Sequence, residues 1–176
     1  MTFASGPVSI GIDPGISGAI AFLPDGAAPW VEDMPTLAYS DTGVTKRAVD
    51  GRALARLLEP FAMAGNARVY LERVQPMPSI PGAGGIRRSM GAASAFAFGM
   101  SYWGAASVIA ALAIELHLVH PQTWKAHFKL RKDKEMARAL AIRFYPAAPL
   151  GRKKDQGRAE ALLIARYGVD AHRNSR

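Results

Sequence analysis

The sequence contains no cysteine among its 176 residues. This absence excludes disulfide bonds, zinc sites built from thiolates and catalysis by a thiol nucleophile. Any metal ion must therefore be held by oxygen or nitrogen ligands. A chain without cysteine also suits a reducing compartment, and we expect a cytoplasmic protein.

The sequence also lacks a recognisable targeting segment and a long uninterrupted apolar run. Its start, MTFASGPVSIGIDPG, has no basic region followed by an apolar run and a cleavage site, so no secretory signal is expected. The most apolar stretch, residues 91–118, is rich in alanine and interrupted by serine, glycine and glutamate, which favours a buried helix over a membrane span. Without an internal repeat, residues 1–176 are expected to form one domain with a loose polar tail at 168–176.

Acidic residues are fewer than basic ones, with 14 Asp and Glu against 22 Lys and Arg, a formal charge of +8. Such a surplus on a small domain raises the local concentration of polyanions, of which nucleic acid is the commonest. The net charge indicates the class of partner, but it does not identify a reaction.

Short apolar runs bounded by turn residues predict five strands, at residues 8–13, 18–23, 30–34, 67–72 and 115–120. The first three are expected to form an antiparallel meander. Apolar residues at helical spacing predict helices at residues 50–64, 89–112, 121–128, 132–145 and 158–167. Strands that are followed by alternating helices and strands predict an α/β fold. We expect a five-stranded mixed sheet, with three antiparallel strands first and then parallel strands, flanked by helices.

The sequence is less clear about two helices and one loop. Asp50 is placed to cap the first helix, and Pro60 can kink or shorten it. The helix at residues 89–112 is either continuous or broken near Gly104. Residues 76–88, with three prolines, three glycines and two adjacent arginines, are expected to form an exposed mobile loop.

Two acids end predicted strands. Asp13 ends the first strand and Glu72 ends the fourth, so neighbouring strands would bring both carboxylates to one edge of the sheet. Like charges this close are stable when a cation neutralises them, and oxygen ligands match Mg²⁺ or Mn²⁺. Asp155 and Glu160 lie at the start of the last helix, where the helix dipole also favours anions. The alternative is that each of these acids caps a helix or faces water.

Four segments stand out along the chain: GIDPGISGAIAFL at 11–23, VYLERVQPMP at 69–78, HPQTWKAHF at 120–128 and KKDQGRAEALLIARYG at 153–168. GIDPG alone is not very specific, because sugar-kinase and actin-type ATPases begin with a similar strand and turn. Together and in this order, the four segments resemble the RuvC-like Holliday junction resolvases of the RNase H-like superfamily, and most closely the compact forms of phages and prophages.

The resemblance implies a catalytic role for the acids Asp13, Glu72 and Glu160, with Asp155 as a fourth metal ligand. It also implies that Lys125 and Lys134 help to hold the scissile phosphate. Two positions depart from the family pattern. Glu160 stands where aspartate is commoner, and Asp155 precedes it by five residues where the family has three.

The implied activity is cleavage of four-way DNA junctions by two Mg²⁺ ions, for which Mn²⁺ can substitute, leaving a 5′-phosphate and a 3′-hydroxyl. The twofold symmetry of a junction implies a homodimer, with the helix at residues 89–112 as candidate interface. No membrane or organic cofactor is expected. Eight basic residues are expected to contact DNA: Arg87, Arg88, Lys125, Lys132, Lys134, Arg152, Lys153 and Lys154.

Three other functions fit parts of the sequence. A related nuclease that acts on forked DNA or structured RNA would have the same metal site. An ATPase or kinase would share the first strand and turn, but that fold normally needs a second, duplicated domain. A catalytically inactive binder of branched DNA would show no metal-dependent cleavage.

Overall fold

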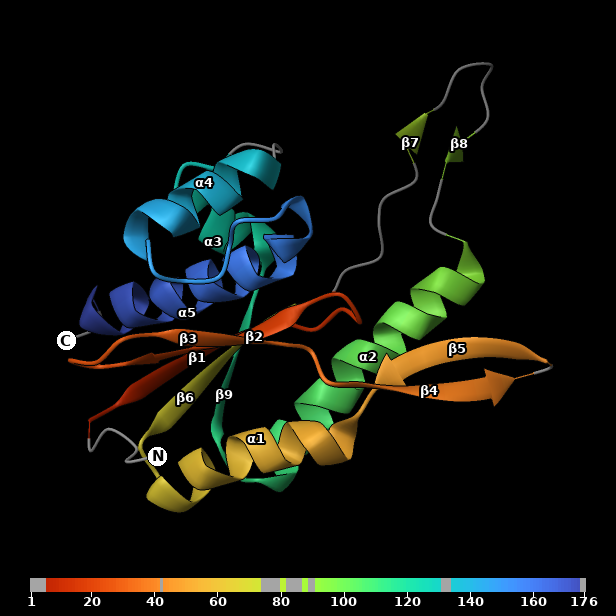
Figure 1. Ribbon diagram of the computed structural model, residues 1–176, viewed down its shortest axis with the longest axis horizontal. Coiled ribbons are helices and arrows are strands. Elements are labelled where there is room, and N and C mark those ends of the chain that lie inside the picture. Colours follow the sequence, from red (N-terminus) through yellow and green to blue (C-terminus); the bar gives the residue numbers. More distant parts are fainter. Residues whose placement is uncertain are drawn as a thin grey trace.

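The computed structural model describes residues 6–41, 43–73, 80–81, 87–88, 91–130 and 134–174. At its centre lies a five-stranded mixed sheet in the order β3-β2-β1-β6-β9 (Figure 1). The first three strands are antiparallel, and β6 and β9 run parallel to β1, as predicted. The strands are β1 (Val8–Asp13), β2 (Ala19–Pro24), β3 (Trp30–Asp33), β6 (Ala67–Glu72) and β9 (Glu115–Val119).

Helices cover both faces of this sheet (Figure 1). Ile10 and Ile12 of β1 belong to a core that includes residues of α1 (Gly51–Ala64) and α2 (Ala92–Ala111). The opposite face, which includes Tyr70, packs against the other helices. These are α3 (Pro121–His127), α4 (Lys134–Phe144) and α5 (Gln156–Asn174). Burial on both faces explains why the central strands are apolar almost throughout.

The start of α1 confirms that Asp50 caps this helix. The side chain of Asp50 accepts a hydrogen bond of 3.0 Å from the backbone N–H of Ala53. The helix continues past Pro60 to Ala64, so the proline does not shorten it. It ends at Gly65, whose φ of 61° is the left-handed conformation that glycine adopts without strain.

Helix α2 is continuous across Gly104, and only part of it is buried as expected. Its buried residues lie in the C-terminal half, from Ser101 to Ile109, whereas its first half is largely exposed. By length and apolar composition α2 is the one helix in the described ranges that could span a membrane, with 28% of the tested window buried. The expectation of a buried helix is therefore wrong for its first half.

Three features differ from the sequence prediction. An antiparallel hairpin of β4 (Thr36–Asp41) and β5 (Val44–Val49) was not predicted; it lies beside α2 in Figure 1. Within residues 76–88, the short strands β7 (Ile80–Pro81) and β8 (Arg87–Arg88) form a ladder where a loop was expected. Helix α5 continues to Asn174, so residues 168–174 are helical and the loose tail expected there is not observed.

Candidate functional site

Asp13 and Glu72 leave the same end of two adjacent parallel strands. Ile12 of β1 is in register with Leu71 of β6, and each acid is the next residue along its strand. The backbone N–H of Gly15 donates to Asp13 Oδ1 at 3.3 Å, which ties the carboxylate to the turn after β1. The register of β1 and β6 thus places Asp13 and Glu72 next to each other at one edge of the sheet.

Glu160 reaches the same region because α5 lies directly on β1 and on the turn that follows it. A Cβ atom on Gly11 would lie 2.2 Å from the backbone oxygen of Ala161. A Cβ atom on Gly157 would lie 2.6 Å from the backbone oxygen of Ser17. Only glycine allows such close approach of two backbones. The two glycines therefore set how deeply α5 sits, and with it the position of Glu160.

We expect Gly157→Ala to destabilise the protein by about 1–3 kcal/mol, because the added methyl group forces backbone atoms apart. Cleavage should also fall, since α5 would carry Glu160 away from β1. Thermal unfolding and a cleavage assay measure the two effects. Gly151→Ala, in the segment between α4 and α5, is the matched control, because nothing lies within 4 Å of its Cβ position. Equal behaviour of the two variants would contradict this account of the helix position.

The three acids influence one another electrostatically. Burial, followed by the charges of Glu72 and Glu160, raises the pKa of Asp13 to about 7. Burial also raises the pKa of Glu72, and the charge of Glu160 adds to this effect. Lys125 acts in the opposite direction on both groups. Such a cluster of buried carboxylates is stabilised by bound positive charge.

Helix α3 holds two of these acids through consecutive residues. Trp124 is fully buried, and its Nε1–H donates to Glu72 Oε1 at 2.9 Å. Lys125 Nζ lies 3.6 Å from Glu160 Oε1 and 4.9 Å from the centre of the Trp124 ring. A further hydrogen bond of 3.4 Å runs from Gln156 Nε2 to Glu160 Oε1. Sequence analysis missed Trp124, although a buried indole N–H needs an acceptor and a strand-end acid is a suitable one.

Replacing Trp124 by phenylalanine should keep the ring packing and remove the hydrogen bond to Glu72. Because that bond lowers the pKa of Glu72, its loss should raise the pKa further and move the acid limb of the pH–cleavage profile upwards. We expect about a tenfold loss of activity near neutral pH, the usual size for a hydrogen bond to a charged group. Trp30→Phe, at an exposed position on β3, is the control. An unchanged profile for Trp124→Phe would refute the positioning role.

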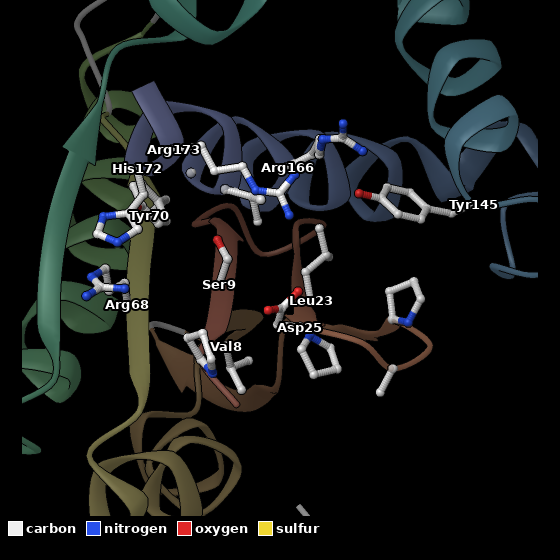
Figure 2. A pocket seen from close by; sticks show the side chains of 16 residues that line it. Val8, Ser9, Leu23, Asp25, Arg68, Tyr70, Tyr145, Arg166, His172 and Arg173 are labelled. Atoms are coloured by element: carbon white, nitrogen blue, oxygen red, sulfur yellow. The ribbon is translucent and has the colours of Figure 1, made fainter. Parts of the chain in front are cut away.

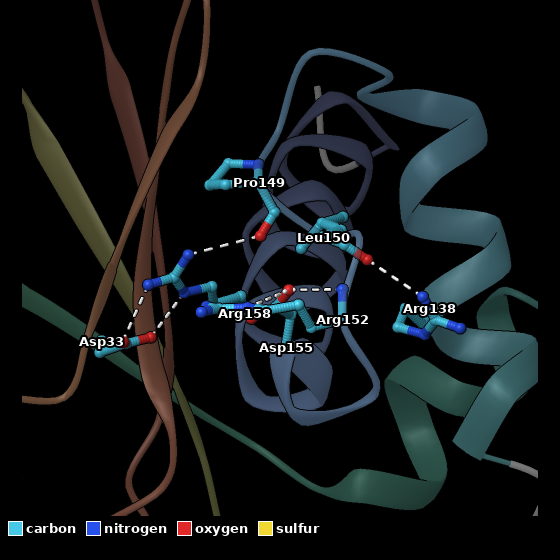
Figure 3. A network of polar contacts seen from close by, with 7 residues as sticks. All are labelled: Asp33, Arg138, Pro149, Leu150, Arg152, Asp155 and Arg158. Carbon is cyan, nitrogen blue, oxygen red and sulfur yellow. Dashed lines mark hydrogen bonds and ion pairs between the residues drawn. The ribbon is translucent and has the colours of Figure 1, made fainter.

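Asp155 forms an ion pair with Arg152 (Figure 3). It ends the 3₁₀ turn η2 (Lys153–Asp155), where Arg152 donates from Nη2 to Oδ1 at 2.7 Å and from its backbone N–H to Oδ2 at 2.8 Å. These hydrogen bonds hold the pKa of Asp155 at about 2. The carboxyl group is buried and satisfied by this contact. Arg152 thus engages the carboxylate that the sequence predicts as a fourth metal ligand, and a metal-binding role for Asp155 stays a prediction.

A second ion pair, between Arg158 of α5 and Asp33 of β3, links this network to the sheet. Arg158 donates from Nη2 to Asp33 Oδ2 at 2.8 Å, and its Nη1 donates to the backbone oxygen of Pro149 at 3.4 Å (Figure 3). Arg138 of α4 donates to the backbone oxygen of Leu150 at 3.1 Å. The contacts fasten the segment between α4 and η2 against β3. They explain why the start of α5 has a fixed position.

The predicted DNA-contacting residues fall into three groups. Lys125 lies beside the acids, and Lys153 and Lys154 are exposed on η2. Arg152 is exposed but engaged with Asp155, so its predicted contact with DNA would compete with an ion pair. For the rest the structure gives no side-chain position. The backbones of Arg87, Arg88 and Lys134 lie in β8 and α4, their side chains are outside the described residues, and Lys132 lies wholly outside them.

The donor chemistry of the acid cluster fits a divalent cation. Asp13, Glu72 and Glu160 offer only carboxylate oxygens, the ligands that Mg²⁺ and Mn²⁺ prefer. Among the described residues, no three acidic or histidine side chains are close enough to form a ready-made metal site. The three acids are thus coupled by charge without forming a closed cage.

Comparison with known proteins supports the fold. No protein-family model matches the sequence, and no curated protein matches it. Among solved structures, the chain is similar to Thermus thermophilus RuvC, with a TM-score of 0.54, 16% identity and 96% of each chain covered. It is also similar to T. thermophilus RuvC in complex with Holliday junction substrate, with a TM-score of 0.56, 17% identity and 96% of each chain covered. The predicted α/β fold with a five-stranded mixed sheet flanked by helices is confirmed.

Proposed function

We propose that this protein is a divalent-metal-dependent endonuclease that resolves four-way DNA junctions. The observation that carries the proposal is the position of Asp13 and Glu72 at the ends of neighbouring strands, with Glu160 on the helix that packs against β1. The formal charge of +8 supports a polyanionic substrate. A neighbour in fold, T. thermophilus RuvC, has been solved with a Holliday junction. The resemblance to compact phage and prophage resolvases makes a phage-type enzyme part of the same proposal.

In this proposal Asp13, Glu72 and Glu160 hold two Mg²⁺ ions, or Mn²⁺ in their place. When bound, such ions supply an activated water and stabilise the charge on the departing 3′-oxygen. Trp124 keeps the Glu72 carboxylate oriented through its hydrogen bond. Lys125, near Glu160, is placed to offset negative charge on the phosphate under attack. Cleavage would leave a 5′-phosphate and a 3′-hydroxyl.

A cleavage assay on matched substrates tests this function. Synthetic four-way junction, fork, duplex and RNA–DNA hybrid of the same sequences should be incubated with Mg²⁺, with Mn²⁺ and with chelator. We expect paired symmetric nicks in the junction only when metal is present, with ends that DNA ligase can seal. Preferential cutting of forks or structured RNA would support the related nuclease. ATP turnover without cleavage would support the ATPase alternative, and junction binding without any cutting would support an inactive binder.

A homodimer that uses α2 belongs to the same proposal, because a junction presents two equivalent strands for cleavage. Phe96, Met100 and Trp103 of α2 have exposed fractions of 71%, 50% and 66%. Large apolar side chains gathered on one helix are typical of a protein interface. A second copy of the chain is the symmetric occupant of such a surface.

Trp103→Glu should convert the dimer to a monomer at micromolar concentration, because a charge would be buried at the interface. Light scattering coupled to size-exclusion chromatography measures the mass. Met63→Glu, on α1, makes the same kind of change at a position that is 84% exposed and should leave the dimer intact. A monomeric wild-type protein, or an unchanged Trp103→Glu dimer, would reject this interface.

A further inference from the structure

A cavity of about 420 Å³ lies between α5 and the strands β1, β2 and β6 (Figure 2). Its walls include Val8 and Ser9 at the start of β1, whereas Asp13 ends that strand. They also include Arg173 in the last turn of α5, roughly 20 Å along the helix from Glu160. The cavity is therefore separate from the candidate nuclease site.

The charged groups that line this cavity are mostly cationic. Arg68, Arg166 and Arg173 line it together with a single acid, Asp25. In Figure 2 the side chains of Arg166 and Arg173 extend from α5 over β1 and β2, and Arg68 comes from the neighbouring strand β6. Three guanidinium groups around one hollow favour an anionic ligand, above all a phosphate.

Two of the arginines keep unused hydrogen-bond donors. Arg68 contacts Glu115 through Nε at 3.0 Å, and Arg166 contacts Asp170 through Nε at 2.9 Å. Neither acid lines the cavity. Arg166 also forms a hydrogen bond with Tyr145, but a guanidinium has five N–H donors. Both ion pairs thus orient an arginine while leaving N–H groups for a ligand.

The remaining walls suit a ring or a sugar. Leu23, Pro29, Val169 and the ring of Tyr145 give the cavity an apolar side, and its volume lies in the usual range of small-molecule sites. We propose that the cavity binds a phosphate ester of nucleotide size, with the arginines on the phosphate and the apolar wall against the base or sugar. The ligand is a free mononucleotide or a nucleotide unit of DNA. This inference does not depend on the nuclease activity.

Arg173 is the residue best suited to a test, because it is exposed and its replacement should not disturb the core. It also offsets the negative end of the α5 dipole, an interaction that needs no ligand. The readout must therefore be ligand binding rather than stability. Arg143→Gln on α4 is the matched control, since Arg143 is also an exposed arginine in the last turn of its helix and does not line the cavity.

Titration calorimetry of the full chain with dAMP at low ionic strength tests the free-nucleotide form of the proposal. We expect dAMP to bind, deoxyadenosine to bind at least about tenfold more weakly, and Arg173→Gln to weaken dAMP binding about tenfold or more. Arg143→Gln should change the affinity less than about twofold. A dAMP affinity that Arg173→Gln leaves unchanged would overturn the assignment to this cavity.

Metal-free binding of a four-way junction at several salt concentrations tests the DNA form. If the cavity takes a nucleotide of DNA, Arg173→Gln should weaken junction binding and lower the salt slope by about one, while Arg143→Gln does not. Wild-type protein that binds no dAMP, together with equal junction binding by the two variants, would refute the site. Because cleavage is not read, failure here is distinct from failure of the nuclease proposal.

Discussion

Asp13→Asn should reduce metal-dependent junction cleavage by at least about a thousandfold while leaving junction binding within about twofold of wild type. The substitution keeps the shape of the side chain and removes the carboxylate that the proposal makes a metal ligand. A loss of this size is usual when a group that acts on the transition state is removed. Single-turnover cleavage with excess enzyme and gel-shift binding without metal give the two quantities.

Glu59→Gln is the control for this variant. Glu59 is exposed on α1, which packs on the face of the sheet opposite α5. The control should cleave at the wild-type rate. Cleavage by Asp13→Asn within about tenfold of wild type would refute the role of Asp13, and equal loss in both variants would show that the effect is not specific to the acid cluster.

The metal-free protein should lose stability as the pH rises from about 4 to about 7. The pKa of Asp13 is raised from 3.8 to about 7 in the folded state, so between these values the folded chain keeps a proton that the unfolded chain has lost. Stability is therefore greatest below the lower value and fully reduced above the upper one. A pKa difference of roughly three corresponds to about 4 kcal/mol. Glu72, whose pKa is also raised, acts in the same direction.

Chemical denaturation at pH 5, 6, 7 and 8 with chelator measures this dependence. Asp13→Asn should flatten it and should be more stable than wild type at pH 8, because the buried charge and its repulsion are gone. Mg²⁺ should restore stability to wild type but not to Asp13→Asn. Asp155 does not interfere, since its lowered pKa affects stability only below about pH 4. A wild-type stability that rises between pH 5 and pH 8 would contradict the electrostatic coupling.

The strands that carry Asp13 and Glu72 could be predicted from sequence to the residue. Both are short runs of buried apolar residues that end in a carboxylate, and burial on two faces leaves no competing pattern. The position of Glu160 is harder to predict. It depends on the close approach of Gly11 and Gly157 to backbone atoms far away in the sequence, which no local pattern reveals.

The ion pair of Asp155 was not predicted. Its carboxylate contacts Arg152, three residues earlier, in a short 3₁₀ turn before α5. The family resemblance and the position of Asp155 at the start of the last helix indicated a metal ligand, because the geometry of that turn is not visible in the sequence. A basic residue three positions before an acid is a signal that an ion pair competes with any other role.

The sequence predicted neither the hairpin β4–β5 nor the exposure of the first half of α2, and the two reasons are opposite. Strands β4 and β5 are mostly exposed, so they lack the apolar pattern by which strands are recognised. Helix α2 is apolar around its whole circumference, so its sequence does not distinguish the side that meets the protein core from the side that does not.

We propose that Asp13, Glu72 and Glu160 form one divalent-cation site. The most direct test is anomalous diffraction from crystals of the wild-type protein soaked in Mn²⁺, with Asp13→Asn crystals treated in the same way. We expect anomalous density bordered by these three carboxylates in the wild-type crystals. The density should be absent from the Asp13→Asn crystals. Mn²⁺ bound only elsewhere, or no density between the three acids at saturating metal, would contradict it.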